Sequence, residues 1–272
     1  MSVSNNVPYS LDDLLRIMQR LRDPETGCPW DVQQNFETIV PSTLEECYEL
    51  AAAIEAGDLE HLPDELGDVL FQVVFYAQLG NEQNLFDFQG VVHGLCSKLL
   101  RRHPHVFADG DIESIVDMQA DSAQVKQRWE EIKAEERADR AQHSALDDVP
   151  LALPALPRAQ KLQKRASRVG FDWADHPPVV ERLQEELTEL AEALNTGTAA
   201  DIEDEMGDVL FTVVNLARHL KVDAESALRR SSQKFERRFR SVEAEAAARG
   251  ASIESFSPEM LDELWAAAKA TS

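Results

Sequence analysis

The 272-residue chain has few of the residues that crosslinked or membrane-spanning proteins need. Its three cysteines, Cys28, Cys47 and Cys96, are an odd number and form no Cys-x-x-Cys pair, so we expect reduced thiols in a cytoplasmic protein. The start shows no apolar signal-peptide segment, and no apolar run approaches the roughly 20 residues of a membrane helix. We therefore expect a soluble protein that has no membrane partner.

Basic residues are also scarce. Lys and Arg number 27 against 50 Asp and Glu, which gives a formal charge of −23, and the pI is near 4.6. Because a protein neutralises nucleic-acid phosphates with clustered Lys and Arg, this balance argues against nucleic acid as a partner. A small anionic substrate would need a metal ion and a local basic patch.

The sequence shows no convincing alternation of apolar and polar residues and no hairpin signal, so the predicted fold class is all-α. Helical periodicity and end signals predict helices at about 11–22, 42–56, 63–79, 88–102, 123–141 and 224–249, and a last one after Ser257. Three prolines among small residues predict an interdomain linker at 143–157, between domains at 1–142 and 158–272.

An acidic stripe on an apolar helix is the most informative single feature. The stretch 205–217 reads Glu-Met-Gly-Asp-Val-Leu-Phe-Thr-Val-Val-Asn-Leu-Ala, and a helix would place Glu205 and Asp208 about 60° apart on one face. Apolar side chains cover most of the remaining circumference, which indicates a helix within a core. Two unpaired carboxylates there would cost several kcal/mol, so basic partners or a cation must compensate them.

A second acidic group precedes this helix. Glu185, Glu186 and Glu189 fall within an arc of about 100° on a helix. The turn at 195–198 joins the two segments into an antiparallel hairpin in which five carboxylates could converge. Five acids without a histidine are typical of a hard cation, so we predict Mg²⁺, with Mn²⁺ as a substitute; zinc or copper would want nitrogen or sulfur ligands.

The chain repeats itself at an offset of 140 residues. The stretch 65–77 is identical to 205–217 at nine of thirteen positions. All five acids recur, and the first copies are Glu45, Glu46, Glu49, Glu65 and Asp68. Basic and aromatic residues recur as well: Lys98, Arg102 and Trp129 pair with Lys234, Arg238 and Trp265. A period this long indicates two homologous domains.

Each of these features also has a structural interpretation. Carboxylates at helical spacing are usually a solvated face, and Ser42-Thr-Leu-Glu45 fits a helix capping box. The apolar helices that carry the acids, and the presence of all five acids in both halves, favour metal binding instead. Basic residues four apart are common on surfaces, but an anion between them would turn their repulsion into attraction. Tryptophan is more often a core residue than a ligand platform.

The tandem pattern Glu-Glu-x-x-Glu followed by Glu-x-Gly-Asp resembles the MazG family of nucleoside triphosphate pyrophosphohydrolases, within the all-α NTP pyrophosphatase superfamily. The likeness spans nearly the whole chain and includes Gly-Cys-Pro-Trp-Asp at 27–31, Arg-Arg-His-Pro-His-Val-Phe at 101–107 and Lys-Phe-Glu-Arg-Arg-Phe at 234–239. The resemblance implies two four-helix-type domains, a homodimer, Mg²⁺ dependence, and hydrolysis of NTPs or dNTPs to the monophosphate and pyrophosphate.

The resemblance also implies roles for individual residues. The metal ligands would be Glu185, Glu186, Glu189, Glu205 and Asp208, and in the first copy Glu45, Glu46, Glu49, Glu65 and Asp68. The nucleotide contacts would be Lys234, Arg238 and Trp265, and in the first copy Lys98, Arg102 and Trp129. We expect a metal-activated water to attack the triphosphate, while Glu185 or Glu186 accepts its proton.

Two other functions are alternatives. A di-iron carboxylate bundle would place a histidine three residues after Glu65 and Glu205, where this chain has aspartate. A non-catalytic nucleotide-sensing or protein-binding helical module would keep the same residues without turnover. The basic surplus around the second acid set predicts that the second domain carries most of any catalysis, through Lys161, Lys164, Arg165, Lys234, Arg237, Arg238 and Arg240.

Overall fold

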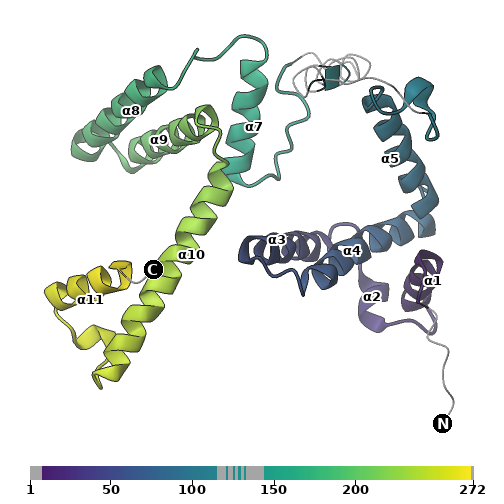
Figure 1. Cartoon of the computed structure of the whole chain (residues 1–272), viewed down its shortest axis with the longest axis horizontal. Helices are drawn as coiled ribbons and strands as arrows, with labels where there is room; N and C mark the ends of the chain where they lie inside the picture. Colours follow the sequence, from purple (N-terminus) through teal and green to yellow (C-terminus); the bar gives the residue numbers. More distant parts are fainter. Residues whose placement is uncertain are drawn as a thin grey trace. The chain divides into compact units, whose positions relative to one another are not determined.

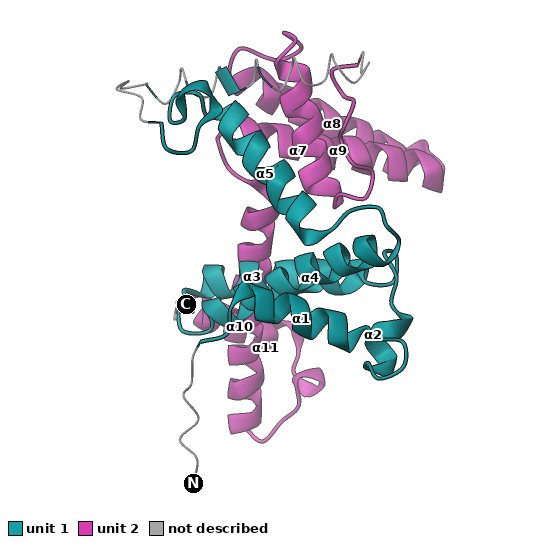
Figure 2. Cartoon of the chain, turned by 90° about the vertical axis from the view of Figure 1, so that its right-hand side faces the viewer, with its two compact units in different colours: residues 1–136 teal, residues 137–272 magenta. Residues whose placement is uncertain are grey.

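The computed structural model describes residues 8–114, 121, 125, 128, 129, 132 and 144–270. All regular structure among these residues is helical, which confirms the predicted fold class. The chain divides into two compact units, residues 1–136 and 137–272, coloured teal and magenta in Figure 2. None of the described helices is both long enough and apolar enough to cross a membrane. The helix predicted at 123–141 falls largely outside the described residues.

Unit 1 is built around a helical pair that carries the first acid set. The pair consists of α3 (Val40–Ala56) and α4 (Leu62–Glu82), which lie side by side in Figure 1. Gly57 ends α3 with a φ of 71°, a left-handed conformation that glycine adopts without strain. The remaining elements are α1 (Leu11–Leu21), α2 (Pro29–Gln33), α5 (Phe88–Arg102) and the short η1 (Ala108–Gly110).

The core of unit 1 forms where α1 packs against α4. Its fully buried side chains are Met18, Ile39, Val74, Phe75 and Leu79. Fully burying an apolar side chain of this size contributes about 1.5–3 kcal/mol. Arg22 closes this core, because its guanidinium lies 5.2 Å from the ring centroid of Phe75 while its Nε donates to Glu82 at 2.8 Å. The apolar face of α4 is therefore covered within its own unit on the α1 side.

Unit 2 repeats the helical pair and adds a longer arm. The pair is α8 (Pro177–Thr196) and α9 (Ala199–His219), and α7 (Ala155–Ser167) packs against α9. The arm is α10 (Ala224–Ala248), against which α11 (Pro258–Ala270) packs after the short η2 (Ile253–Ser255) (Figure 1). Thr198 and Asp201 form a capping box that begins α9 immediately after the turn from α8.

Helix boundaries differ from the sequence prediction at two places that matter for the site. The capping-box interpretation of Ser42 and Glu45 is wrong, because α3 begins at Val40 and Ser42 lies inside the helix. Glu45 is thus left without a capping role. Helix α7 begins at Ala155, so the last residues of the predicted linker at 143–157 are already helical. The domain boundaries at 142 and 158 stay predictions.

Candidate active site

The hairpin of α8 and α9 brings three of the five predicted acids of unit 2 together. One carboxylate oxygen each from Glu186, Glu205 and Asp208 lies within 4.8 Å of the other two. Glu186 is only 4% exposed, whereas Glu205 is half-buried and Asp208 is exposed. The cluster therefore has a buried floor and one side that solvent or a ligand reaches.

The other two predicted acids take different positions. The charge of Glu189 is among the causes that raise the pKa of both Glu186 and Glu205, so Glu189 borders the cluster. Glu185 has a side chain that is 62% exposed, and its Oε2 lies 3.0 Å from Arg182 Nη1. Among the unit 2 acids, Glu185 is the one that the hairpin does not bring to the cluster.

Arg182 is a site residue that the sequence analysis did not assign. Its Nε lies 2.8 Å from Glu186 Oε1, and its Nη2 lies 3.6 Å from Glu189 Oε2. The available signal was the four-residue spacing to Glu186, which places both side chains on one helix face. The equivalent position of the first half is Ser42, so this cation belongs to the second site alone.

The carboxylates of this cluster destabilise one another. Burial raises the pKa of Glu186; Arg182 opposes that rise, and the charges of Asp208 and Glu189 add to it. Burial also raises the pKa of Glu205, and Glu189 and Asp208 add to that rise. In addition, Glu186 Oε2 is buried and accepts no hydrogen bond from the described residues. A divalent cation would ligate this oxygen and cancel the repulsion, so the residues present fit a hard metal ion.

Unit 1 holds a related cluster with a different membership. Oxygens of Glu46, Glu49 and Glu65 lie within 4.8 Å of one another. Burial raises the pKa of Glu46, and the charges of Asp68, Glu49 and Glu45 raise it further, so all five acids lie near one another. Glu46 is half-buried, in contrast to the deeply buried Glu186.

The predicted nucleotide-contacting residues of unit 2 lie on the arm. Lys234 and Arg238 are one turn apart on α10, and Lys234 is exposed. Trp265 of α11 packs against a buried cluster of Val242, Leu264 and Ala268, with its ring centroid 5.3 Å from that of Phe235. The cation whose charge lowers the pKa of both Glu186 and Glu205 is Arg182 of α8. The role of the arm residues in nucleotide binding stays a prediction.

The corresponding residues of unit 1 lie on α5 or near its end. Lys98 and Arg102 are on α5, and the Trp129 ring centroid lies 6.3 Å from that of His103, just beyond the end of α5. The structure thus places both basic pairs and both tryptophans on elements other than the acidic hairpins.

The chain matches known proteins over these same segments. The model of the MazG nucleotide pyrophosphohydrolase domain matches residues 34–107 and 175–242, which contain both acid sets and both basic pairs. The chain belongs to the MazG family. It is 54% identical over 257 residues to the nucleoside triphosphate pyrophosphohydrolase of Escherichia coli (strain K12), covering 94% of this chain and 95% of the relative.

Two more distant relatives match as well. A nucleoside triphosphate pyrophosphohydrolase/pyrophosphatase MazG from Thermotoga maritima is 43% identical over 258 residues, which is 95% of each chain. A nucleoside triphosphate pyrophosphohydrolase from Mycolicibacterium smegmatis is 32% identical over 213 residues, or 78% of this chain and 59% of the relative. The first two relatives match this chain nearly end to end, so the likeness includes both segments that match the MazG domain.

A cavity of about 340 Å³ adjoins the second MazG acid cluster. Its walls come from α7, α8, α9 and the loop that carries Phe171 and Trp173, and both Arg182 and Glu186 line it. The volume is in the range of small-molecule sites. A ligand in this cavity would lie directly beside the carboxylates that fit a metal ion.

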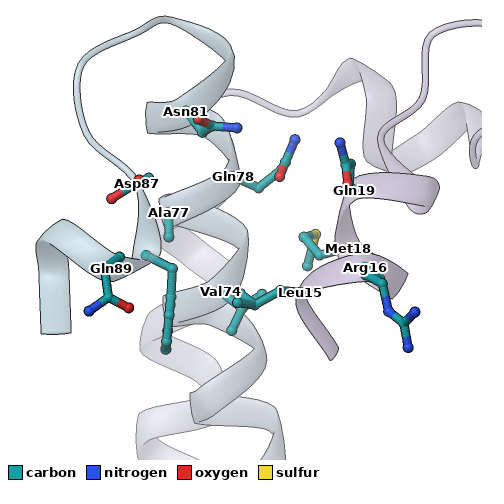
Figure 3. Close-up of a pocket in the computed structure, with 11 residues that line it drawn as sticks. Leu15, Arg16, Met18, Gln19, Val74, Ala77, Gln78, Asn81, Asp87 and Gln89 are labelled. Atoms are coloured by element: carbon teal, nitrogen blue, oxygen red, sulfur yellow. The ribbon is translucent and has the colours of Figure 1, made fainter. Parts of the chain in front are cut away.

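Unit 1 has a cavity of about 300 Å³ between α1, α4 and the start of α5. Figure 3 shows Gln19 and Gln78 on opposite sides of it, above the apolar side chains of Leu15, Met18 and Val74. None of the five acids of unit 1 lines this cavity, which lies along the second half of α4. It is therefore separate from the candidate metal cluster of its own unit.

Proposed function

We propose that the chain hydrolyses nucleoside triphosphates or deoxynucleoside triphosphates to the monophosphate and pyrophosphate, with Mg²⁺ as cofactor and unit 2 as the main catalytic site. The MazG family is a family of nucleotide pyrophosphohydrolases, and the relatives from E. coli and T. maritima carry that activity in their names. The single observation that supports the site most strongly concerns Glu186: one buried oxygen of this residue has no hydrogen-bond partner among the described residues and lies within a group of mutually repelling carboxylates.

Glu186, Glu205 and Asp208 would hold the metal ion, and Glu189 borders them. When bound, Mg²⁺ neutralises phosphate oxygens, orients the triphosphate and lowers the pKa of a water molecule. Mn²⁺ would substitute, because the donor set is oxygen only.

Arg182 supplies the local cation that capture of a triphosphate by an acidic chain requires. Its guanidinium is shared among three carboxylates, and phosphate oxygens accept the same forked set of donors. Transfer of Arg182 to the substrate would release Glu186 Oε1 from its ion pair. That oxygen would then be available to accept the proton of the attacking water. Glu185, the other predicted proton acceptor, is less well placed because most of its side chain is in solvent.

A homodimer is part of this proposal because α9 exposes an apolar stripe. Met206, Leu210 and Val213 lie at i, i+4 and i+7 and are 44%, 51% and 43% exposed. Contiguous exposed apolar surface of this kind marks interaction sites, and helical pairs commonly complete their cores by symmetric pairing. We propose that a second copy of the chain covers the stripe.

The dimer would also complete the nucleotide site. Lys234 and Arg238 lie on α10 of the arm, whereas the acids lie on the α8–α9 hairpin (Figure 1). We propose that the arm of one copy reaches the acids of the other, so that Lys234 and Arg238 grip phosphates beside Glu205 and Asp208.

Pyrophosphate release from the full chain tests the function. We expect the full chain to release pyrophosphate from at least one NTP or dNTP in the presence of Mg²⁺. In the fragment 155–272, assayed alone, Asp208→Asn should abolish the pyrophosphate release that the unchanged fragment shows. Glu203→Gln, which changes an exposed acid on the same helix, is the control that should keep full activity. Full activity in Asp208→Asn would refute the site. Nucleotide binding without pyrophosphate release in the wild-type chain would instead favour the nucleotide-sensing alternative.

A further inference from the structure

The cavity beside the second acid cluster has the composition of a site for a planar ligand. Leu162, Phe171, Trp173 and Phe211 give it apolar and aromatic walls, and Arg182 and Glu186 form the side that meets the metal-binding acids. Aromatic walls stack well on flat rings, and a few fixed polar groups then orient the ring. Two buried amides of the cavity, Gln163 and Asn215, provide such groups.

Gln163 presents a fixed hydrogen-bond acceptor. The residue is 7% exposed, and its Nε2 donates to the backbone carbonyl of Phe211 at 2.8 Å. This bond orients the amide, so Oε1 is the atom left to face a ligand. Oε1 is buried and has no hydrogen-bond partner among the described residues. A buried acceptor without a donor is destabilising, and a ligand with an N–H group would relieve the cost.

Asn215 presents a fixed hydrogen-bond donor. It is 6% exposed, and its Oδ1 accepts from Arg218 Nε at 3.1 Å and from Arg218 Nη2 at 2.7 Å. Arg218 is itself held by Asp172, whose Oδ2 accepts from Arg218 Nη1 at 2.8 Å. With Oδ1 occupied in this way, Nδ2 is the group that Asn215 offers to a ligand. The cavity thus combines one oriented acceptor with one oriented donor.

We propose that this cavity seats the nucleobase of the substrate and that Gln163 and Asn215 read the edge of the base. Every common nucleobase is planar and carries both a donor and an acceptor on its pairing edge, which matches Gln163 Oε1 and Asn215 Nδ2. A base seated here directs the sugar and phosphates toward Arg182 and Glu186. The proposal rests on the proposed function, since it names where the substrate of that site places its base.

The first half of the chain differs at the position that corresponds to Asn215. Position 75 corresponds to position 215 in the repeat, and Phe75 is completely buried in the core of unit 1. An apolar ring, over which the Arg22 guanidinium lies, takes the place of the polar amide. We therefore propose the base seat for unit 2, the unit to which the proposed function assigns catalysis.

Binding to the full chain in Mg²⁺ tests the proposal without turnover. The probes are the α,β-methylene analogues of ATP, GTP, CTP and UTP, together with inorganic pyrophosphate as a ligand that has no base. We expect the wild-type chain to bind at least one analogue more tightly than pyrophosphate. Gln163→Met keeps the side-chain length but removes the acceptor, and it should weaken that analogue about tenfold while pyrophosphate affinity stays within twofold. Gln184→Met, at an exposed position of α8, is the matched control and should change neither affinity.

A second measurement does not depend on the Gln163 variant folding well. The preferred analogue should quench the fluorescence of Trp173, pyrophosphate should not, and the quenching should disappear in Trp173→Phe. Equal weakening of analogue and pyrophosphate in Gln163→Met, unchanged analogue affinity in that variant, or wild-type affinities that do not depend on a base would each overturn the proposal. Base-dependent binding by a chain that releases no pyrophosphate would uphold the base seat and refute the proposed function.

Discussion

The Glu186→Gln variant should be more stable than the wild type without Mg²⁺ and less stable than the wild type with Mg²⁺. Glutamine has nearly the same size and shape, so the change removes a charge without making a cavity. In the metal-free protein one buried oxygen of the wild-type carboxylate has no hydrogen-bond partner among the described residues, and the charges of Asp208 and Glu189 repel the group. The amide of Gln at position 186 would carry no charge and could donate to a neighbouring carboxylate.

The expected magnitude follows from two opposing contributions. Relief of one unsatisfied buried acceptor stabilises by about 1–3 kcal/mol. Loss of the ion pair with Arg182 costs at least the roughly 0.3–0.5 kcal/mol of an exposed helix pair, and more to the extent that Glu186, with a side chain 5% exposed, is buried. We therefore expect the variant to be more stable without metal by about 1 kcal/mol, which corresponds to a rise of about 3 °C in the Tm of unit 2.

Magnesium should invert this difference. At a free Mg²⁺ concentration of about 100 times Kd, binding stabilises the wild-type protein by about 2.7 kcal/mol, whereas the variant has lost a ligand and gains less. Calorimetric melts in EDTA and in Mg²⁺, with the exposed substitution Glu192→Gln as control, measure both states. A variant that melts below wild type in EDTA, or one that gains as much as wild type from Mg²⁺, would refute the assignment of Glu186 as a buried metal ligand.

Three further outcomes follow from the same geometry. Without metal, the stability advantage of Glu186→Gln should shrink as the pH falls. The folded-state pKa of Glu186 is raised, so its charge destabilises the wild type above that pKa and no longer does so below the ordinary glutamate range. Melts from neutral to mildly acidic pH measure this change. Co-expressed Asp208→Asn and Lys234→Ala chains should recover pyrophosphate release that neither has alone, since a mixed dimer keeps one intact site; no recovery would argue against an arm that crosses between copies. Trp265→Ala should lower the Tm, because Trp265 packs in the α10–α11 core, and it should weaken nucleotide binding less than Gln163→Met does. An unchanged Tm in melts, together with a larger loss of nucleotide affinity than in Gln163→Met, would make Trp265 a ligand platform.

Helical periodicity was sufficient to predict the class and most helix positions. The segment 88–102 coincides with α5, because Asp87 caps its start and the helix stops before His103-Pro104. The start of α3 was missed because Ile39 already has a helical conformation, so the Ser42 side chain has no free amide to cap. Local sequence signals marked helix faces well, but the backbone conformation of the preceding turn decided where this helix began.

The acids were recognisable because carboxylates on an apolar face need compensation wherever the helix packs. The amides of the cavity were not, because Gln163 and Asn215 look like ordinary polar residues of amphipathic helices. Their significance depends on which atoms are already bonded: Gln163 Nε2 to a carbonyl of α9, and Asn215 Oδ1 to Arg218. Contacts of this kind join residues 48 positions apart in the first case, and a helical pattern carries no information about them.

The divergence between the two halves follows a physical logic. Both hairpins keep five acids, so both keep the electrostatic cost of grouping carboxylates. The second half adds Arg182 where the first has Ser42, and Asn215 where the first has Phe75. In the proposed function the first change would supply a cation that moves from the acids to phosphate, and the second would supply a polar group to the cavity that seats the base. Phe75, at 0% exposure, gives the first half a better core than the second has at that position. In the proposed function the second copy, which has Arg182 beside its acids and an amide at position 215, would therefore be the one that binds the nucleotide.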